Sequence, residues 1–410
     1  MKRAMAQKTK QTKKWIRFRH RVVRNVAYAI LKPYSYWKYG VRIERFAAQE
    51  KRPYLVLLNH QTPFDQFFVG MAFHGPIYYM ATEDIFSNGI VSSLIRYLVA
   101  PIPIKKQTTD IKAIKTCLRV AKEGGTISIA PEGNRTYSGR TEYMSPSIAP
   151  LARRLGMPIV LFRIEGGYGA HPRWSDVVRK GEMRGYVSRV IQPEEYASLS
   201  DDELFAIIRD GLYVNEANDE NEFFHKKSAE YLERAVYVCP FCGLSSFESE
   251  GDRITCKRCE RQVRYLPSTA LEGIGFEFPF RFVAEWYDAQ ADFIKSLNVL
   301  EYDAEPMYRE RVDLYEVIPY EKKNLLAENI DVALYGNRIE LGDGDAKTVC
   351  RFEQTAAITV LGRNKLNVYY DDKIYQIKGS KRFNALKYVH IYHRCKNIVK
   401  GESYEQFLGL

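Results

Sequence analysis

Two short polar strings, each placed directly after an apolar run, constrain the fold of this chain more than any other feature. Residues 59–65 (NHQTPFD) follow the run 54–58, and residues 130–136 (APEGNRT) follow the run 126–130. Short apolar runs bounded by turn-forming residues predict buried strands. In a parallel α/β sheet the carboxyl ends of such strands share one edge, so distant residues meet there. We therefore predict an α/β sheet with flanking helices and a polar site at that edge.

The first string contains a histidine and an aspartate that suit acid–base chemistry. A reaction in which a hydroxyl group attacks needs a base for the hydroxyl proton, and histidine titrates near neutral pH. A carboxylate on the other ring nitrogen holds the imidazole in the required tautomer. We predict His60 as the base and Asp65 as the orienting group. An alternative stays open, because residues 62–65 also fit a helix start in which Asp65 is only a cap.

The second string offers groups that could bind an anionic substrate. Gly133 lets the backbone approach a ligand closely, and its N–H is a candidate donor to an oxyanion that develops during a reaction. Arg135 suits an anionic headgroup, because a guanidinium can contact phosphate at two points. Glu132 would either fasten Arg135 or contact the hydroxyl groups of the acceptor.

In this order the strings resemble the motifs of the glycerolipid acyltransferases, which include the lysophosphatidic acid acyltransferases. That family carries Asn-His-x4-Asp and then Phe-Pro-Glu-Gly-Thr-Arg-Ser, and residues 102–106 (IPIKK) and 158–162 (PIVLF) resemble two further blocks. The resemblance covers about residues 50–190. It implies a 1-acylglycerol-3-phosphate acyltransferase-like enzyme that uses acyl-CoA or acyl carrier protein as donor and a lysophospholipid, first of all lysophosphatidic acid, as acceptor. The implied catalytic residues are His60 and Asp65, and the implied substrate-binding residues are Glu132, Gly133, Arg135 and Lys106.

Some positions depart from the family pattern and keep another acceptor open. Lys106 stands where the family usually has arginine, and an ammonium group contacts phosphate only as a point charge. Leu161 replaces the second proline of the fourth block. The same chemistry on a glycolipid or an amino-acid lysolipid is therefore the alternative acceptor reading.

The N-terminal segment is strongly basic. Net charge is +11, the first acidic residue is Glu44, and ten lysines and arginines precede position 25. Apolar residues recur at helical spacing from Trp15 through Phe18, Val22 and Val26 to Ile30. This pattern predicts an interfacial helix on an anionic membrane, although docking on the enzyme core or binding of nucleic acid would fit a basic stripe too.

No apolar stretch of about 18 residues and no signal peptide is visible. We accordingly expect a cytoplasmic protein, peripheral on the inner face of the membrane.

Four cysteines form two Cys-x2-Cys pairs separated by thirteen residues: Cys239, Cys242, Cys256 and Cys259. Paired knuckles at this spacing resemble the zinc ribbons and predict a tetrahedral four-thiolate site, with iron as the rival metal. Four protein thiolates leave no open coordination position, so the expected role of zinc is structural. Cys117, Cys350 and Cys395 lack ligand spacing and are predicted to be buried.

The last hundred residues predict a small β-rich domain. Turn signals at residues 336–337, 362–364 and 371–372 separate strand-like runs, and a helix follows Asn384. This pattern resembles the pleckstrin-homology-like barrels. The predicted divisions are a basic arm (1–45), an acyltransferase domain (46–235), a zinc ribbon (236–270) and the β-rich domain (300–410). A non-enzymatic nucleic-acid-binding or scaffold protein, built on the ribbon and the arm, is the alternative from another functional class.

Overall fold

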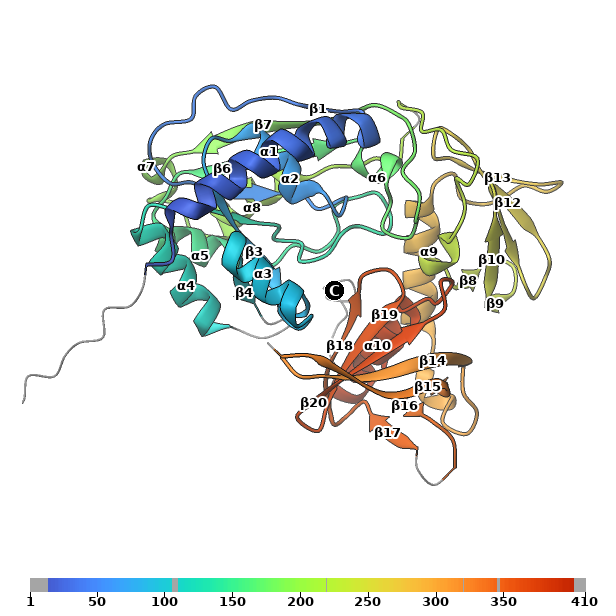
Figure 1. The fold of residues 1–410 in the computed structure, drawn as a ribbon. Helices are drawn as coiled ribbons and strands as arrows, with labels where there is room; N and C mark the ends of the chain where they lie inside the picture. Colours follow the sequence, from blue (N-terminus) through green and yellow to red (C-terminus); the bar gives the residue numbers. More distant parts are fainter. Residues whose placement is uncertain (1–13, 105–109, 219, 320, 345–346, 402–410) are drawn as a thin grey trace, which may run out of the picture.

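The computed structural model describes residues 14–104, 110–218, 220–319, 321–344 and 347–401. Along the chain an α/β unit is followed by a small four-stranded sheet and then by a larger β-rich unit, which we call the C-terminal β unit (residues 308–401) (Figure 1).

Seven strands form the sheet of the α/β unit, in the order β1-β7-β6-β2-β5-β3-β4. Neighbouring strands are parallel except for the β6–β7 pair. The strands are β1 (Val41–Ile43), β2 (Leu55–Leu58), β3 (Ile77–Thr82), β4 (Ile102–Ile104), β5 (Thr126–Ile129), β6 (Ile159–Glu165) and β7 (Met183–Ile191). β2 lies between β5 and β6, so the carboxyl ends of these three strands share one edge. The two strands predicted before the polar strings are confirmed.

Helices cover both faces of this sheet. Alternate residues of β2 enter two separate cores, Leu55 and Leu57 in one and Val56 and Leu58 in the other. The helices α4 (Ile111–Lys122), α5 (Ile148–Leu155) and α8 (Asp201–Leu212) supply side chains to the first core, and α2 (Asp65–Ala72) supplies them to the second. α1 (Phe18–Tyr39) runs beside α2. The sheet begins at Val41, earlier than the predicted domain start at residue 46, because β1 pairs with β7.

The cysteine-rich region is built from short antiparallel strands. These are β8 (Val238–Cys239) with β9 (Gly243–Leu244), and then β10 (Phe247–Glu250), β11 (Arg253–Cys256), β12 (Gln262–Tyr265) and β13 (Leu271–Gly273). A helix that the sequence did not predict, α9 (Val283–Ser296), packs against β8. There the Trp286 indole N–H donates to Val238 O at 2.7 Å.

Seven antiparallel strands and one helix form the C-terminal β unit, in the order β17-β16-β15-β14-β20-β19-β18. The strands are β14 (Tyr308–Val317), β15 (Lys323–Leu334), β16 (Arg338–Leu341), β17 (Thr348–Arg351), β18 (Thr355–Leu361), β19 (Lys365–Tyr370) and β20 (Lys373–Gly379), followed by α10 (Leu386–Lys400). The predicted turns and the final helix are confirmed, whereas β14 and β17 were missed. Likeness to the pleckstrin-homology barrels stays a prediction.

One hydrophobic core joins the three parts of the molecule. It contains Tyr265 from the cysteine-rich region, Trp286 from α9 and Leu386 from α10. It also contains Trp174 from the segment between β6 and β7 (residues 166–182), which we call the loop after β6 and which includes the short helix α6 (Gly167–Ala170). The loop that follows β6 is therefore held by the appended units as well as by its own sheet. This packing matters below, because the same loop borders the candidate site.

Candidate active site

His60 and Asp65 form a hydrogen-bonded pair at the end of β2. The Asp65 carboxylate is buried, with 1% of its side chain exposed, and its Oδ2 lies 2.7 Å from Nδ1 of His60. The His60 side chain is 26% exposed, and among the described residues no group binds its other ring nitrogen, Nε2. A neutral imidazole held in this way has a proton on Nδ1 and a lone pair on Nε2, which is the form that a general base needs.

The surrounding turn fixes the Asp65 carboxylate firmly. It accepts hydrogen bonds from the backbone N–H of Gln61 (2.7 Å) and of Thr62 (3.0 Å) and from the Thr62 hydroxyl (2.6 Å). The Thr62 hydroxyl in turn accepts the N–H of Phe64 at 3.1 Å. Asp65 thus fixes the turn that precedes α2 and also orients His60, whereas Phe64 occupies the N-cap position and α2 has no side-chain cap. The helix itself begins at Asp65.

Two side chains hold the backbone around His60. The amide of Asn59 exchanges two hydrogen bonds of 2.8 Å with the backbone of Ile164, which ties the end of β2 to β6. The carboxylate of Glu132 accepts the His60 backbone N–H at 2.8 Å. The described structure contains no ion pair between Glu132 and Arg135, so it does not support the first of the two roles considered for Glu132. Contact with the hydroxyl groups of the acceptor stays a prediction. Burial raises the pKa of the Glu132 carboxyl well above its usual range.

Gly133 occupies the turn that the second string predicted. Its φ of +69° lies in the left-handed region that favours glycine. Its backbone N–H donates to Ala130 O at 3.0 Å and so closes the turn. This N–H already donates within its own turn, so the structure does not support it as the oxyanion donor, and that role stays an untested prediction.

Arg135 lies at the same edge without an acidic partner. Its Nη1 is buried and has no hydrogen-bond partner among the described residues. Burial, together with the like charges of Arg173 and Arg363, lowers the pKa of this guanidinium to about 10, so it stays charged at neutral pH. Beside it is a small hollow lined by Glu132, Asn134, Arg135, Thr136, Glu142, Tyr143 and Arg173. A half-buried cation with one buried, unpaired nitrogen suits an anionic ligand.

Arg173 is a site residue that the sequence analysis missed. It is 3% exposed, donates to Arg135 O at 3.1 Å, and stacks its guanidinium 4.4 Å from the centre of the Tyr137 ring. It belongs to the loop after β6, whose carboxyl end lies on the same edge as that of β2. Applying the strand-end rule to the fourth block as well would have found it.

Lys106, the remaining predicted substrate-binding residue, lies outside the described residues. The strand before it, β4, is present at the edge of the sheet.

The four paired cysteines converge on one point. Their Sγ atoms all lie within 4.8 Å of one another, and the pairs Cys239–Cys259 and Cys242–Cys256 are 3.7 Å and 3.6 Å apart. Zn–S bonds of about 2.3 Å in a tetrahedron require S···S separations close to these. The donor set therefore fits the predicted metal. Cys117, Cys350 and Cys395 are buried, as predicted.

Residues 41–165 match the family model described as Acyltransferase. This segment, less than half of the chain, is similar to the acyltransferase family. It contains both polar strings, His60 with Asp65 and Glu132 with Arg135, and it ends where the loop carrying Arg173 begins.

Curated relatives agree with this family at low identity. A 1-acyl-sn-glycerol-3-phosphate acyltransferase from Bacillus subtilis (strain 168) is 24% identical over 136 residues, which are 33% of this chain and 65% of the relative. The chloroplastic 1-acyl-sn-glycerol-3-phosphate acyltransferase of Brassica napus is 19% identical over 178 residues, 43% of this chain and 51% of the relative. The chain thus spans less than two thirds of either relative.

Among solved structures, the 1-acyl-sn-glycerophosphate acyltransferase of Thermotoga maritima aligns with a TM-score of 0.38 at 20% identity, over 47% of this chain and 75% of that one. In the described part of the chain, no helix has the length and apolarity that crossing a membrane requires.

Proposed function

We propose that this protein transfers a fatty acyl group from acyl-CoA or acyl carrier protein to the hydroxyl group of a lysophospholipid, most simply lysophosphatidic acid. The acceptor oxygen attacks the thioester carbonyl carbon while Nε2 of His60 takes the hydroxyl proton. The C–O bond forms, the C–S bond breaks, and the proton passes to the departing thiolate. Asp65 holds the ring and stabilises the imidazolium between these steps.

The His60–Asp65 contact of 2.7 Å at the carboxyl end of a central parallel strand is the observation that carries the proposal. It provides a base whose proton-accepting nitrogen is unpaired in the described structure, within a segment similar to the acyltransferase family. The test is an assay of purified full-length protein with acyl-CoA, acyl carrier protein and a panel of lysolipids. Transfer to none of these acceptors would overturn the proposal. Transfer only to a glycolipid or an amino-acid lysolipid would support the alternative acceptor.

Arg135 gives the first prediction about the acceptor. Replacing Arg135 by alanine should raise the KM for lysophosphatidic acid about tenfold to a hundredfold and leave the donor KM nearly unchanged, since a hydrogen bond to a charged group contributes about 1.5–3 kcal/mol. Arg135→Lys should recover part of the loss, because it restores the charge but not the fork. Steady-state kinetics with each substrate varied in turn measure both constants, and equal effects on donor and acceptor would mean that Arg135 only supports the loop.

The surface of α1 and α3 (Ile90–Leu98) favours work at a membrane. Four apolar side chains of the predicted stripe are exposed, from Val22 at 46% to Phe18 at 79%. Trp15 is the one residue of the predicted stripe that packs against the core containing Leu55 and Leu57. Its indole N–H donates to Ala100 O at 3.1 Å. α3 adds a second exposed row, including Ile90 at 89% and Leu94 at 54%. We infer that these two rows insert among lipids while the arginines of α1 attract anionic headgroups.

Substituting this surface should weaken lipid binding without harming the fold. Val26→Ser combined with Leu94→Ser should reduce binding to anionic vesicles at high salt about tenfold or more, because each inserted side chain adds on the order of 1 kcal/mol that salt does not screen. Vesicle co-sedimentation across a salt series measures this. Leu325→Ser, at a side chain 48% exposed on β15, is the matched control. Equal losses in the control and in the double variant would place the lipid contact elsewhere.

We also propose that the four paired cysteines hold one structural zinc ion. Backbone N–H groups of Phe241 and Cys242 hydrogen-bond to the sulfur of Cys239, and that of Arg261 to the sulfur of Cys259. Such contacts stabilise thiolates, and thiolates are what a metal needs. The site is closed by four protein ligands, so its contribution is to stability and not to the acyl transfer.

A further inference from the structure

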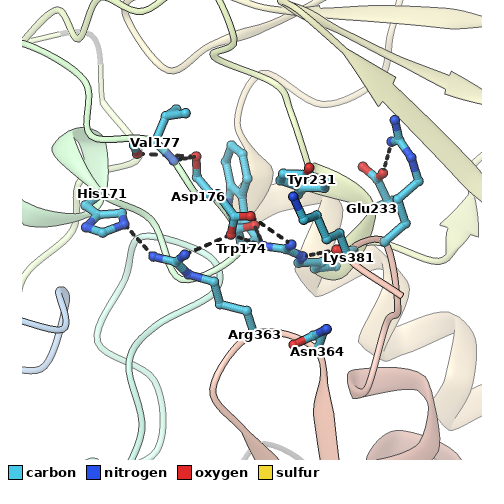
Figure 2. A network of polar contacts seen from close by, with 12 residues as sticks. His171, Trp174, Asp176, Val177, Tyr231, Glu233, Arg363, Asn364 and Lys381 are labelled. Carbon is cyan, nitrogen blue, oxygen red and sulfur yellow. Dashed lines mark hydrogen bonds and ion pairs between the residues drawn. The ribbon is translucent and has the colours of Figure 1, made fainter. Parts of the chain in front are cut away.

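Arg363 lies at the turn between β18 and β19 and extends from the C-terminal β unit to the α/β unit. Its Nη1 donates to Asp176 Oδ1 at 2.8 Å, and its Nη2 donates to His171 Nε2 at 2.8 Å (Figure 2). Both partners belong to the loop after β6, the loop that also carries Arg173. A distant part of the chain therefore brings a cation to the loop that borders the candidate acceptor site.

The contacts of His171 connect this arginine to the catalytic motif. A guanidinium only donates, so Nε2 of His171 accepts and its Nδ1–H donates to Tyr39 Oη at 2.9 Å. Burial and the charges of Arg363 and Arg135 lower the pKa of His171 to about 3, which keeps the ring neutral. The Tyr39 ring packs on that of Phe64, with centres 5.3 Å apart, and Phe64 directly precedes Asp65. Arg363 is thus connected to the His60–Asp65 pair through the side chains of His171, Tyr39 and Phe64.

Positive charge is in excess around this point. Arg173 and Arg363 both lie close enough to Arg135 to lower its pKa, and Nη1 of Arg135 has no partner among the described residues. Glu132 and Glu142, which line the same hollow as Arg135 and Arg173, compensate this charge poorly, since burial raises the pKa of both carboxyl groups. Arg363 shares the carboxylate of Asp176 with Arg234, whose Nη1 lies 2.7 Å from Asp176 Oδ1. Guanidinium groups therefore outnumber ionised carboxylates here, and an anion that carries more than one charge would stabilise them.

We propose that Arg363, together with Arg135 and Arg173, completes the headgroup site for a phosphate monoester, so that the C-terminal β unit forms part of the active site. This inference rests on the proposed acyl transfer and specifies its acceptor. The Arg363 side chain is 30% exposed, so a headgroup can reach its remaining N–H groups while Asp176 and His171 hold the fork in place. A phosphate monoester carries close to two charges at neutral pH, whereas the diester of a lysophosphatidylcholine carries one and a monoacylglycerol none.

Arg363→Ala should therefore raise the KM for lysophosphatidic acid about tenfold, leave the donor KM unchanged, and change transfer to monoacylglycerol by less than twofold. Calorimetric titration of the full-length protein with sn-glycerol 3-phosphate gives a readout that needs no turnover, and its Kd should rise by a similar factor. The exposed Arg309 on β14 supplies the matched control, because Arg309→Ala removes the same charge from the same unit.

A second variant separates headgroup binding from a purely structural contact between the units. Asp176→Asn weakens the same contact from the other side, and the contact of Asp176 with Arg234 as well, but keeps the Arg363 cation. It should therefore lower the melting temperature and raise the acceptor KM clearly less than Arg363→Ala does. If Asp176→Asn and Arg363→Ala raise that KM equally, Arg363 only fastens the units and the inference is wrong. If the wild type is active and Arg363→Ala does not change its preference among acceptors, the inference about Arg363 is wrong and the proposed acyl transfer still holds. A wild type that transfers to no acceptor, yet binds glycerol 3-phosphate through Arg363, overturns the proposed function alone.

Discussion

His60→Ala should lower kcat for acyl transfer about a thousandfold, with little change in the KM of either substrate. The substitution removes the group that takes the acceptor proton in the proposed mechanism, and general base catalysis contributes about 10²–10⁴ in rate. The fold should persist, because the His60 ring is partly exposed and its backbone N–H to Glu132 is retained. Initial rates and thermal melting on the same preparation test the two halves of this expectation. Near-normal turnover in well-folded His60→Ala would overturn the mechanism.

Asp65→Asn tests the orienting role separately. The amide keeps the shape but loses the charge that stabilises the imidazolium, so kcat should fall clearly, by less than in His60→Ala. Some loss of stability is expected as well, because the Asp65 carboxylate accepts the backbone N–H groups of Gln61 and Thr62 in the turn before α2. His74→Ala is the control for loss of a histidine, since this exposed residue at the end of α2 should leave kcat unchanged.

The polar edge of the sheet was predictable from the sequence, because short apolar runs predict buried strands and parallel strands end at a common edge. Apolar runs became β2 and β5, and strands that are parallel and adjacent bring His60 and Glu132 together. The role of each side chain at this edge depends on the partners and directions of its hydrogen bonds, and the spacing of residues in the sequence does not predict these. The Glu132 carboxylate binds a backbone N–H of the first string, and the Gly133 N–H closes its own turn.

Contacts between units were beyond the sequence analysis. Arg363 lies in a turn that was predicted correctly, but nothing in a local pattern says that the turn rests on a loop almost two hundred residues earlier. The helix α9 was missed because it has no polar N-cap, and Phe282 precedes its first residue. Its apolar side chains, Trp286 among them, are buried by three units together and not by one neighbouring strand.

Removal of the metal from the four-cysteine site should have the largest effect on stability. Structural zinc contributes about 10–16 kcal/mol of apparent binding free energy in small domains at neutral pH. Protein purified without added metal should contain one zinc per chain by elemental analysis, and Cys242→Ser should lower this content and the melting temperature together. Cys117→Ala is the matched control, because this buried cysteine lies in another core, far from the four sulfurs along the chain. Iron in place of zinc would identify the rival metal, and a folded cysteine-rich region without any metal would overturn the site.

The consequences of metal loss should spread along a path that the contacts define. The backbone of β8, which carries Cys239, is held by the Trp286 indole on Val238 O and by the Gln290 amide oxygen, which accepts the N–H of Tyr237 at 2.7 Å. Loosening the cysteine cluster therefore frees α9, and with it the core that supports the loop after β6. Chelation should shift the fluorescence of the buried Trp286 first. If Arg363 and that loop form the headgroup site, the acceptor KM should then rise before kcat falls, since His60 and Asp65 rest on the separate cores of the α/β sheet.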